Sequence, residues 1–396
     1  MTQKLYLDHS YETVFEGAIV SVQPAPAPNT TSVVLDRTLF YPESGGQLSD
    51  YGEMGGAKVI DVQETGGDVV THTVVGDAPA HGNVRGTIDW PRRFDHMQQH
   101  TGQHVLSRAF IKTDGLDTVS FHMGDETCTI DLEGQLPDAA AIRRAEDLSN
   151  QIIAENRPID IVTIPIEQVD MSELRRKVPD GVRDARIVTV RDFDRIPCCG
   201  THVRSTGELG MIKVLKTEKV KNLQRVHFKV GVRAYDDYRD KHAVLQELSQ
   251  RLTTAPLDVA AKVERMLEES QASAKQTKTL IQRLASLEAE RLLAAADAAA
   301  VRIIVHREAD SALARALATE MQKVPGTVAI IGADDGAVVC VSSHELGIDL
   351  ATGAGALARE LGGSGGGKGG FAQAKVDPAR VGEFMERMAA NVRARR

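Results

Sequence analysis

The chain has 396 residues, which is too long for one ordinary hydrophobic core, so two or three domains are expected. A hydrophobic content of 42% and a charged content of 26% are typical of a soluble globular protein. The net charge of −8 excludes attraction of a nucleic acid by the protein as a whole, so any such partner needs a local basic face.

The N-terminus and the cysteines indicate a cytoplasmic protein. The first residues, MTQKLYLDHSYETV, lack the basic start and apolar run of a signal peptide. No uncharged apolar stretch approaches 18 residues, so no membrane span is expected. Because two of the four cysteines are adjacent, a disulfide framework is disfavoured, and a reducing cytoplasm with a metal-binding role fits better; the cysteines are Cys128, Cys198, Cys199 and Cys340.

Residues 1–90 contain short β-forming runs separated by Gly and Pro clusters. The predicted strands are VFEGAIVSVQ, TSVVLDRTLFY, AKVIDVQET, DVVTHTVV and GNVRGTIDW. The intervening YPESGGQLSDYG is too rich in turn formers for regular structure. This pattern predicts an N-terminal small β-barrel or antiparallel sheet.

Residues 91–235 change to an α+β pattern, with a sheet and helices packed on it. RRFDHMQQHTGQHVLSRAFIK has helical spacing, DTVSFHMGDETCTIDL is typical of a hairpin, and LPDAAAIRRAEDLSNQIIAEN is a helix opened by Pro137 and Asp138. Strands are predicted at DIVTIPI, RIVTVRDF, MIKVLKTEK and QRVHFKVG, and RIPCCGTHVRSTGELG is predicted to be a polar loop.

Residues 236–298 contain no glycine and no strand signal. Leucine stripes on either side of TTAPLD predict two long helices in an antiparallel hairpin arm, with Thr254 and Pro256 starting the second helix. An ordinary helical linker and a coiled-coil dimer arm remain alternatives. Residues 299–396 form a C-terminal α/β domain, with strands VRIIVH, TVAIIG and AVVCVSS and a helix at SALARALATEMQ.

Seven glycines lie between Gly362 and Gly370. Gly362 to Lys368 matches the phosphate-loop pattern G-x-x-x-x-G-K, but Gly369 stands where a Ser or Thr should hold Mg²⁺, so no nucleotide site is predicted. The simple interpretation is a flexible loop. The functional interpretation is a surface on which backbone amides and Lys368 bind RNA phosphates.

His100 and His104 lie four residues apart on a predicted helix, so their Cβ atoms are about 5–6 Å apart and both imidazoles can reach one metal. Such a pair is weak evidence alone. His96, one turn earlier, also allows His96–His100 as the ligand pair.

Cys198 and His202 form a second pair at the same spacing, in a loop whose Gly200 permits a tight backbone. The two pairs together favour one Zn²⁺, because imidazole and thiolate are both ligands that zinc prefers. A metalloprotease would have a Glu after the first helical His, where this chain has Thr101. The missing carboxylate favours a more labile bond, such as an ester.

HTGQH and CCGTH, in this order and separation, resemble the zinc motifs of the alanyl-tRNA synthetase editing domain. FYPESGGQLSDYG and RVHFKVGVRAYDDY resemble the loop before this domain and the strand that closes it. GGSGGGKGGFAQA is similar to the signature of the synthetase's last domain, called DHHA1 or C-Ala. The resemblance covers nearly the whole chain, and no aminoacylation domain is expected. It is that of the long-form AlaX family of free-standing alanyl-tRNA editing proteins.

The resemblance implies ATP-independent deacylation of Ser-tRNA(Ala) in trans, with Gly-tRNA(Ala) as a second substrate. It implies Zn²⁺ on His100, His104, Cys198 and His202, catalytic roles for His100, His104 and Gln47, and Gly45 and Gly46 near the reacting terminal adenosine. Cys199 stands where the synthetase usually has Gly. Cys199 therefore competes with Cys198 as ligand, although only Cys198 keeps the four-residue spacing.

The hairpin that carries Thr118, Ser120 and His122 is expected to form a pocket wall, where a hydroxyl pairs with the seryl hydroxyl of the substrate. One alternative function is a structural-zinc module of a tRNA-binding protein, because closed four-ligand sites are typically structural. Another is editing of a different tRNA, such as the threonyl one. A homodimer through the region beyond about residue 240 is expected from the helical arm and the resemblance.

Overall fold

The computed structural model describes residues 1–66, 68–77, 80–296 and 300–394. The chain divides into two compact units, Met1–Glu247 and Leu248–Arg396. The segments predicted as a barrel and as an α+β domain lie together in the first unit, and the finer four-domain division stays a prediction. No described helix is both long enough and apolar enough to cross a membrane.

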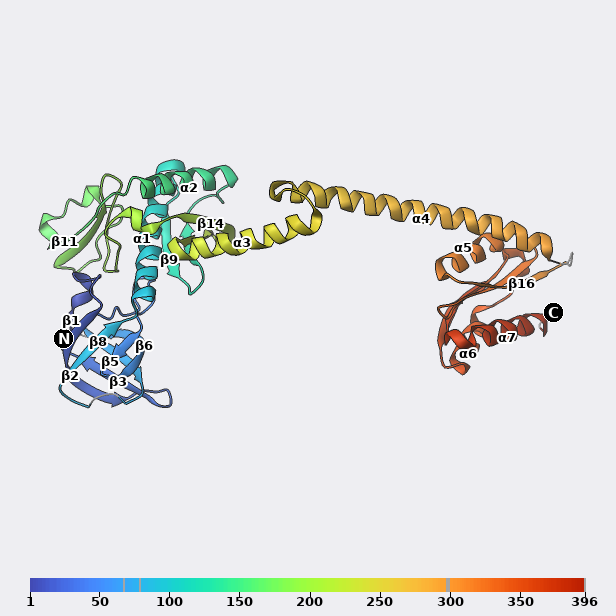
Figure 1. Ribbon diagram of the computed structural model, residues 1–396, viewed down its shortest axis with the longest axis horizontal. Helices are drawn as coiled ribbons and strands as arrows, with labels where there is room; N and C mark the ends of the chain where they lie inside the picture. The colour runs from blue at the N-terminus through green and yellow to red at the C-terminus, as the bar shows by residue number, and fades with distance from the viewer. Residues whose placement is uncertain (67, 78–79, 297–299, 395–396) are drawn as a thin grey trace. The chain divides into compact units, whose positions relative to one another are not determined.

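Six antiparallel strands close into a barrel at the N-terminal end of the first unit (Figure 1). Alternate apolar side chains, such as Phe15, Leu35 and Val74, fill its core. The closed order agrees with the antiparallel barrel predicted from the sequence. The strands, in the order in which they pair, are β2 (Val14–Pro24), β3 (Thr30–Leu35), β7 (Val69–Val75), β6 (Ala57–Thr65), β5 (Gly52–Met54) and β8 (Asn83–Ile88).

Two details of the barrel differ from the prediction. The strand predicted over residues 31–41 ends at Leu35, and a short strand β4 (Arg37–Thr38) pairs instead with β1 (Gln3–Lys4). β5 begins at Gly52, inside the segment predicted to be a loop. A Cβ at Gly52 would lie 2.0 Å from the carbonyl oxygen of Thr87, so this glycine serves close strand pairing.

The barrel core contains a buried imidazole, His72. Its Nδ1 lies 3.0 Å from the carbonyl oxygen of Val33 and therefore donates, while its Nε2 lies 2.9 Å from the hydroxyl of Thr38. Burial lowers the pKa of His72 from 6.5 to about 4. The folded barrel therefore holds His72 neutral.

Protonation of His72 should make the barrel less stable in acid. The unfolded chain takes up this proton near pH 6.5 and the folded chain near pH 4, so stability is lost as the pH falls through this window, by about 3 kcal/mol at its lower end. We expect His72→Gln to show a shallower pH dependence of the unfolding free energy than the wild type, measured by denaturant titration. The exposed His9, changed to Gln, should keep the wild-type slope. Equal slopes for all three proteins would contradict this account.

Helix α1, Trp90–Asp114, runs from the barrel through the first unit (Figure 1). Asp89 caps its first turn by accepting a hydrogen bond from the N–H of Arg92, and Gly115, with φ of 68°, ends it. Residues 96–107 are all buried, although many of them are polar. A polar helix survives such burial only if its side chains find partners, and these partners form the site described below.

Helix α1 contacts α2, a four-stranded sheet and a three-stranded sheet. Strand β13 was not predicted, because most of its residues were assigned to a loop. It pairs with β12 and leads directly to Cys198. Helix α2 spans Ala139–Ala154. The four-stranded sheet contains, in pairing order, β14 (Ile212–Val220), β15 (Leu223–Val230), β10 (Cys128–Leu132) and β9 (Thr118–Met123). The three-stranded sheet contains β11 (Ile159–Pro165), β12 (Asp184–Val190) and β13 (Asp194–Pro197).

The two long helices predicted for the arm are present. Helix α3, Gly231–Leu252, contains the boundary between the units, and α4, Val259–Ala295, belongs to the second unit. A 3-10 turn, Pro256–Asp258, precedes α4, so the second helix starts later than Thr254. Residues 297–299, at the predicted boundary between arm and last domain, lie outside the described residues. The antiparallel packing of the arm stays a prediction.

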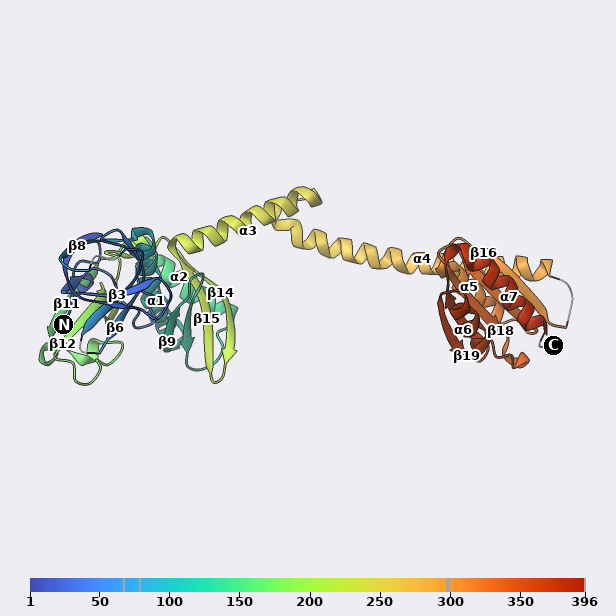
Figure 2. The ribbon, with the colours of Figure 1, turned by 90° about the horizontal axis from the view of Figure 1, so that it is seen from below.

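A five-stranded sheet with helices on both faces forms the rest of the second unit (Figure 2). Helix α5 and the end of α4, through Ala285 and Ala289, cover one face, and α6 and α7 cover the other. In pairing order the strands are β16 (Arg302–Glu308), β17 (Thr327–Ala333), β18 (Ala337–Ser342), β20 (Phe371–Lys375) and β19 (Ser364–Lys368), with α5 (Ser311–Gln322), α6 (Ala351–Glu360) and α7 (Val381–Ala394).

The glycine-rich run is a strand, and its interpretation as a flexible loop is wrong. β19 pairs antiparallel with β20, and Gly369 and Gly370 form the turn between them. A Cβ at Gly365 would lie 2.9 Å from the carbonyl oxygen of Gln373, and one at Gly367 would lie 2.0 Å from that of Phe371. The glycines therefore allow close approach of neighbouring backbone.

Candidate metal centre

Four side chains from two distant segments converge in the first unit. His100 and His104 come from α1, and Cys198 and His202 come from the loop after β13; their ligand atoms all lie within 4.8 Å of one another. Nε2 of His100 and Nε2 of His202 each lie 3.4 Å from Sγ of Cys198. His96 is not part of the cluster, so the alternative pair His96–His100 is wrong.

Cys198 is the cysteine that faces the other three ligands, whereas its neighbour Cys199 is exposed. Strand β13 ends at Pro197, so Cys198 is the first residue after regular pairing. The guanidinium of Arg186 fixes the loop that follows, donating to the carbonyl oxygens of Cys198 (2.6 Å) and Gly200 (3.0 Å). The four-residue spacing thus pointed to the cysteine that lies in the candidate cluster.

Gln47 orients His100 from the loop between β4 and β5. Its Oε1 lies 2.7 Å from Nδ1 of His100, and an amide oxygen only accepts, so Nδ1 carries the proton and Nε2 keeps its lone pair for the cluster. Gln47 is itself held by the hydroxyl of Thr201 at 2.8 Å and the N–H of Thr201 at 3.2 Å. Gln47 is fully buried, which suits a positioning role.

His202 has a comparable partner. Its Nδ1 lies 3.1 Å from the hydroxyl oxygen of Thr101, which also accepts from the N–H of Val203 at 3.3 Å. Its Nε2 therefore remains free to face Cys198. Nδ1 of the third imidazole, His104, is buried and has no partner among the described residues.

Burial keeps the three imidazoles neutral. It lowers the pKa of His100 to about 3, helped by the charge of Arg186, and holds the pKa values of His104 and His202 well below their usual range. Burial also raises the pKa of the Cys198 thiol to about 11. Neutral imidazoles are ready ligands, and a buried thiolate needs a cation beside it. This donor set therefore fits a metal ion.

Gly200 is required by the space beside His100. A Cβ at this position would lie 2.1 Å from Cε1 and 2.3 Å from Nδ1 of His100, and 3.0 Å from Oε1 of Gln47. The backbone of Gly200 is not in the left-handed region, so the tight backbone expected from the sequence does not explain this glycine. The close approach of the His100 ring explains it instead.

We expect Gly200→Ala to displace the His100 ring and break its hydrogen bond to Gln47. Loss of such a partner typically weakens metal binding by about 10–100-fold, and a chelator competition titration would measure this. Gly66 has open space around it, so Gly66→Ala should bind metal like the wild type. Unchanged affinity in Gly200→Ala would show that the ring tolerates the methyl group.

A cavity of about 240 Å³ lies beside the cluster. His100, His104 and Cys198 line it, together with residues from distant segments: Tyr41, Ser44, Gly45, Gln103, Phe121, Arg175, Arg176, Ile196, Pro197, Cys199 and Gly200. No Asp or Glu is among the described residues that line it. The cavity is thus bordered by cationic and neutral groups.

The two glycines predicted near the substrate have different surroundings. Gly45 lines the cavity, and nothing lies within 4 Å of the position its Cβ would take. Gly46 packs on β9, where a Cβ would lie 2.5 Å from the carbonyl oxygen of Phe121, and its own carbonyl accepts from the N–H of Met123. Gly45 is therefore the one that leaves room inside the cavity.

The predicted wall residues on β9 need a correction. Phe121 lines the cavity and stacks on His100, with ring centroids 5.5 Å apart, whereas Ser120 and His122 do not line it. Ser120 donates instead to Asp131 at 2.8 Å. Successive side chains of a strand point to opposite faces, so Phe121 lies on the face opposite to Ser120 and His122. Thr118 is buried and is not among the described residues that line the cavity; its hydroxyl donates to that of Ser107 at 2.8 Å.

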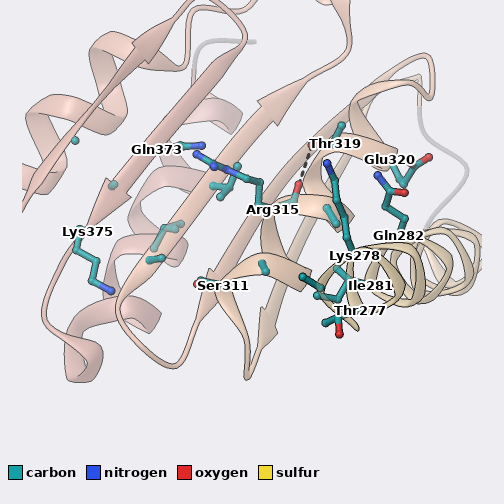
Figure 3. Close-up of a pocket in the computed structure, with 18 of the residues that line it drawn as sticks. Thr277, Lys278, Ile281, Gln282, Ser311, Arg315, Thr319, Glu320, Gln373 and Lys375 are labelled. Carbon is teal, nitrogen blue, oxygen red and sulfur yellow. Dashed lines mark hydrogen bonds between the residues drawn. The ribbon is translucent and has the colours of Figure 1, made fainter. Parts of the chain in front are cut away.

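A larger cavity, about 1230 Å³, lies in the second unit between α4, α5 and the sheet (Figure 3). Lys278 from α4, Arg315 from α5 and Lys375 from β20 bring positive charge to it. Glu320 is the one acidic residue among the described residues that line it. The described residues of this lining include no His or Cys, so they offer groups for binding but no ligand cluster like that of the first unit.

Three family models match successive parts of the chain. A model of class II (A) tRNA synthetases matches residues 13–92, the threonyl and alanyl tRNA synthetase second additional domain matches residues 185–227, and the DHHA1 domain matches residues 293–394. The second match includes Cys198 and His202.

Relatives that align with large parts of the chain agree with these matches. The chain is 32% identical over 324 residues to alanyl-tRNA editing protein Aarsd1-B of Xenopus laevis, covering 78% of each chain. It is 37% identical over 244 residues to alanyl-tRNA editing protein AlaX-L of Pyrococcus horikoshii, covering 59% of each. An alanine–tRNA ligase of Ignicoccus hospitalis is 28% identical over 403 residues, which covers 99% of this chain but 43% of the ligase. The chain therefore belongs to the family of alanyl-tRNA editing proteins.

Proposed function

We propose that the chain is a deacylase that hydrolyses the ester of mischarged tRNA(Ala), with Ser-tRNA(Ala) as its main substrate and Gly-tRNA(Ala) as a second. The observation that carries this proposal is the 240 Å³ cavity directly beside the cluster of three imidazoles and a thiol. The names of the relatives, alanyl-tRNA editing proteins, supply the substrate class.

His100, His104, Cys198 and His202 would hold Zn²⁺, for which three imidazoles and a thiolate are suitable ligands. When bound, the ion supplies Lewis-acid stabilisation of the ester, and four protein ligands favour positioning of the substrate over delivery of hydroxide. Gln47 holds His100 in the tautomer and orientation that this set requires.

The reaction is hydrolysis of an ester. A water oxygen adds to the carbonyl carbon, the bond from this carbon to the ribose oxygen breaks, and the ribose oxygen takes the proton. Gly45 leaves space for the terminal ribose, and Phe121 offers an aromatic face to the adenine. Because none of the described residues that line the cavity has a carboxylate, the protein contributes orientation and electrostatics more than general-base catalysis.

Deacylation assays with Ser-tRNA(Ala), Gly-tRNA(Ala) and Ser-tRNA(Thr) test this proposal. We expect hydrolysis of the first two and little of the third, because the DHHA1 match favours the alanine system. A preference for Ser-tRNA(Thr) would assign the chain to another tRNA. Binding of tRNA(Ala) without hydrolysis would support the structural-zinc alternative, which the closed set of four ligands favours.

The second unit is proposed to bind the body of the tRNA. Lys278 and Arg315 are exposed beside the 1230 Å³ cavity, where RNA phosphates could reach them (Figure 3). The double variant K278Q/R315Q should weaken tRNA(Ala) binding and reduce its salt dependence, measured by filter binding. Binding and salt dependence equal to the wild type would remove this surface from consideration.

A homodimer through the second unit is the remaining proposal. Helix α4 exposes apolar side chains at helical spacing, each at least 42% exposed: Val263, Met266, Leu267, Leu280, Leu284 and Leu287. A stripe of this kind is typical of helix pairing. Sedimentation should show a mass that rises with concentration, and a monomer mass at all concentrations would contradict the proposal.

A further inference from the structure

We propose that Arg175 is a catalytic residue that donates hydrogen bonds to the carbonyl oxygen of the bound ester. This inference rests on the proposed deacylase function. It names a protein group that stabilises negative charge during the reaction, in addition to the four ligands.

Arg175 is fixed to the strand that carries the cysteine ligand. It follows the 3-10 helix Met171–Glu173, and its backbone N–H donates to the carbonyl oxygen of Arg195 on β13 at 2.9 Å. Its side-chain Nε donates to both carboxylate oxygens of Asp194, at 2.9 and 3.1 Å. Both side chains are almost fully buried, at 2% and 1% exposure. The guanidinium therefore has little freedom to turn away.

The outer part of this guanidinium has no partner in the part of the chain that the structure describes. Nη1 and Nη2 are buried and make no hydrogen bond with any described residue. Burial of unpaired donors on a charged group is costly, so such donors usually bind a water molecule or a ligand. The cavity that Arg175 lines offers no described carboxylate as acceptor. The acceptor that these donors fit is an oxygen atom of a bound molecule.

Arg175 lines the same cavity as His100, His104 and Cys198. After burial and the neighbouring His100, the charge of Arg175 is the next cause of the low pKa of His104, which indicates that the two side chains are close. Nδ1 of His104 is another buried atom without a described partner.

The chemistry of ester hydrolysis explains the need for such donors. Addition of water to the carbonyl carbon moves an electron pair onto the carbonyl oxygen, which becomes an oxyanion. When the bond to the ribose oxygen breaks, the pair returns. The guanidinium keeps its own protons throughout, because an arginine side chain stays charged in proteins and acts by hydrogen bonding. Donors of this kind bind the oxyanion more strongly than the neutral ester, so they raise kcat more than they lower KM.

Arg176 provides a matched control. It is the next residue and lines the same cavity, but its Nη2 already donates to the carbonyl oxygen of Thr118. We expect Arg175→Gln to lower kcat on Ser-tRNA(Ala) by about 100–1000-fold, with KM within about threefold of wild type and with normal metal content. Arg176→Gln should change kcat by less than about tenfold. Added guanidinium ion should restore part of the activity of Arg175→Ala.

Removal of Arg175 leaves Asp194 buried and unpaired, so a folding defect has to be separated from a catalytic one. The double variant R175Q/D194N removes both charges and is compared with D194N alone. In this background the loss of kcat should persist while the melting temperature stays close to that of D194N.

Four results would overturn the proposal. The first is an unchanged kcat in folded Arg175→Gln, and the second is a raised KM of this variant with a weaker salt dependence, as expected of a phosphate contact. The third is loss of metal in R175Q/D194N. The fourth is loss of activity in Arg175→Ala that added guanidinium does not restore. A wild-type protein that hydrolyses none of the mischarged tRNAs would instead refute the proposed function, so the two failures are distinguishable.

Discussion

His104→Ala should lower ester hydrolysis about a thousandfold or more, which corresponds to about 4 kcal/mol of transition-state stabilisation. His104 belongs to the cluster, and its ring centroid lies 5.1 Å from that of His100 and 4.9 Å from that of His202. The change removes one of four ligands and leaves the cavity lining otherwise intact. Single-turnover deacylation, metal analysis and circular dichroism of the same preparation measure activity, occupancy and fold together.

His96→Ala is the control for His104→Ala. His96 is equally buried, lies two turns earlier on the same helix and belongs to no ligand cluster among the described residues. This variant should keep its metal and its activity, although loss of a buried side chain lowers its stability. If His104→Ala unfolds the first unit while His96→Ala does not, the metal has a structural role, and the catalytic interpretation is wrong.

Asp50→Ala should destabilise the first unit by about 3–5 kcal/mol, because it leaves a buried guanidinium without its counter-ion. Arg93 and Asp50 are both fully buried, and Nε of Arg93 lies 3.0 Å from each carboxylate oxygen of Asp50. Arg93 belongs to the first turns of α1, and Asp50 also accepts from the N–H of Tyr41 at 2.6 Å. The pair thus joins the helix of His100 to the loop of Gln47.

Denaturant unfolding measures this loss, and two variants calibrate it. Asp50→Asn keeps one acceptor oxygen for Arg93 and Tyr41, so it should lose less stability than Asp50→Ala. Asp160→Ala breaks an exposed pair with Arg191, at 3.2 Å and about half exposed on both sides, and should cost less than about 1 kcal/mol. A loss below about 1 kcal/mol for Asp50→Ala as well would mean that the buried pair contributes little.

The metal cluster was accessible from the sequence because each ligand pair has a local spacing. His100 and His104 share a helix face, and Cys198 and His202 share a short loop. Two local patterns were therefore enough to predict the four residues of the cluster. The strands of the barrel were predictable for the same reason, since their periodicity is local. The histidine pair and the Cys–His pair could then be assigned to one site without knowing the fold of the residues between them.

Arg175 and Phe121 were missed because their roles depend on contacts between distant segments. SELRRKVPDG has no periodic pattern that distinguishes Arg175 from an ordinary surface arginine. On β9 the face of the strand could not be chosen, so Ser120 and His122 were predicted in place of Phe121.

Glycine was the least predictable residue. At Gly200 its use depends on the ring of His100, about a hundred residues away, and at Gly365 on the backbone of the neighbouring strand. Composition alone suggests a loop in both places. Only the three-dimensional neighbour shows that the missing side chain serves packing.

The separation of the ligands along the chain also affects how the protein is made. Cys198 follows His100 by 98 residues, so a nascent chain cannot complete the site until the ribosome has passed His202. A bound ion would then act as a cross-link that closes a long loop, and closing a loop of this length restricts the unfolded chain by about 4–5 kcal/mol in the chain-entropy description. Zinc supply during synthesis would therefore influence the yield of folded protein as well as its activity.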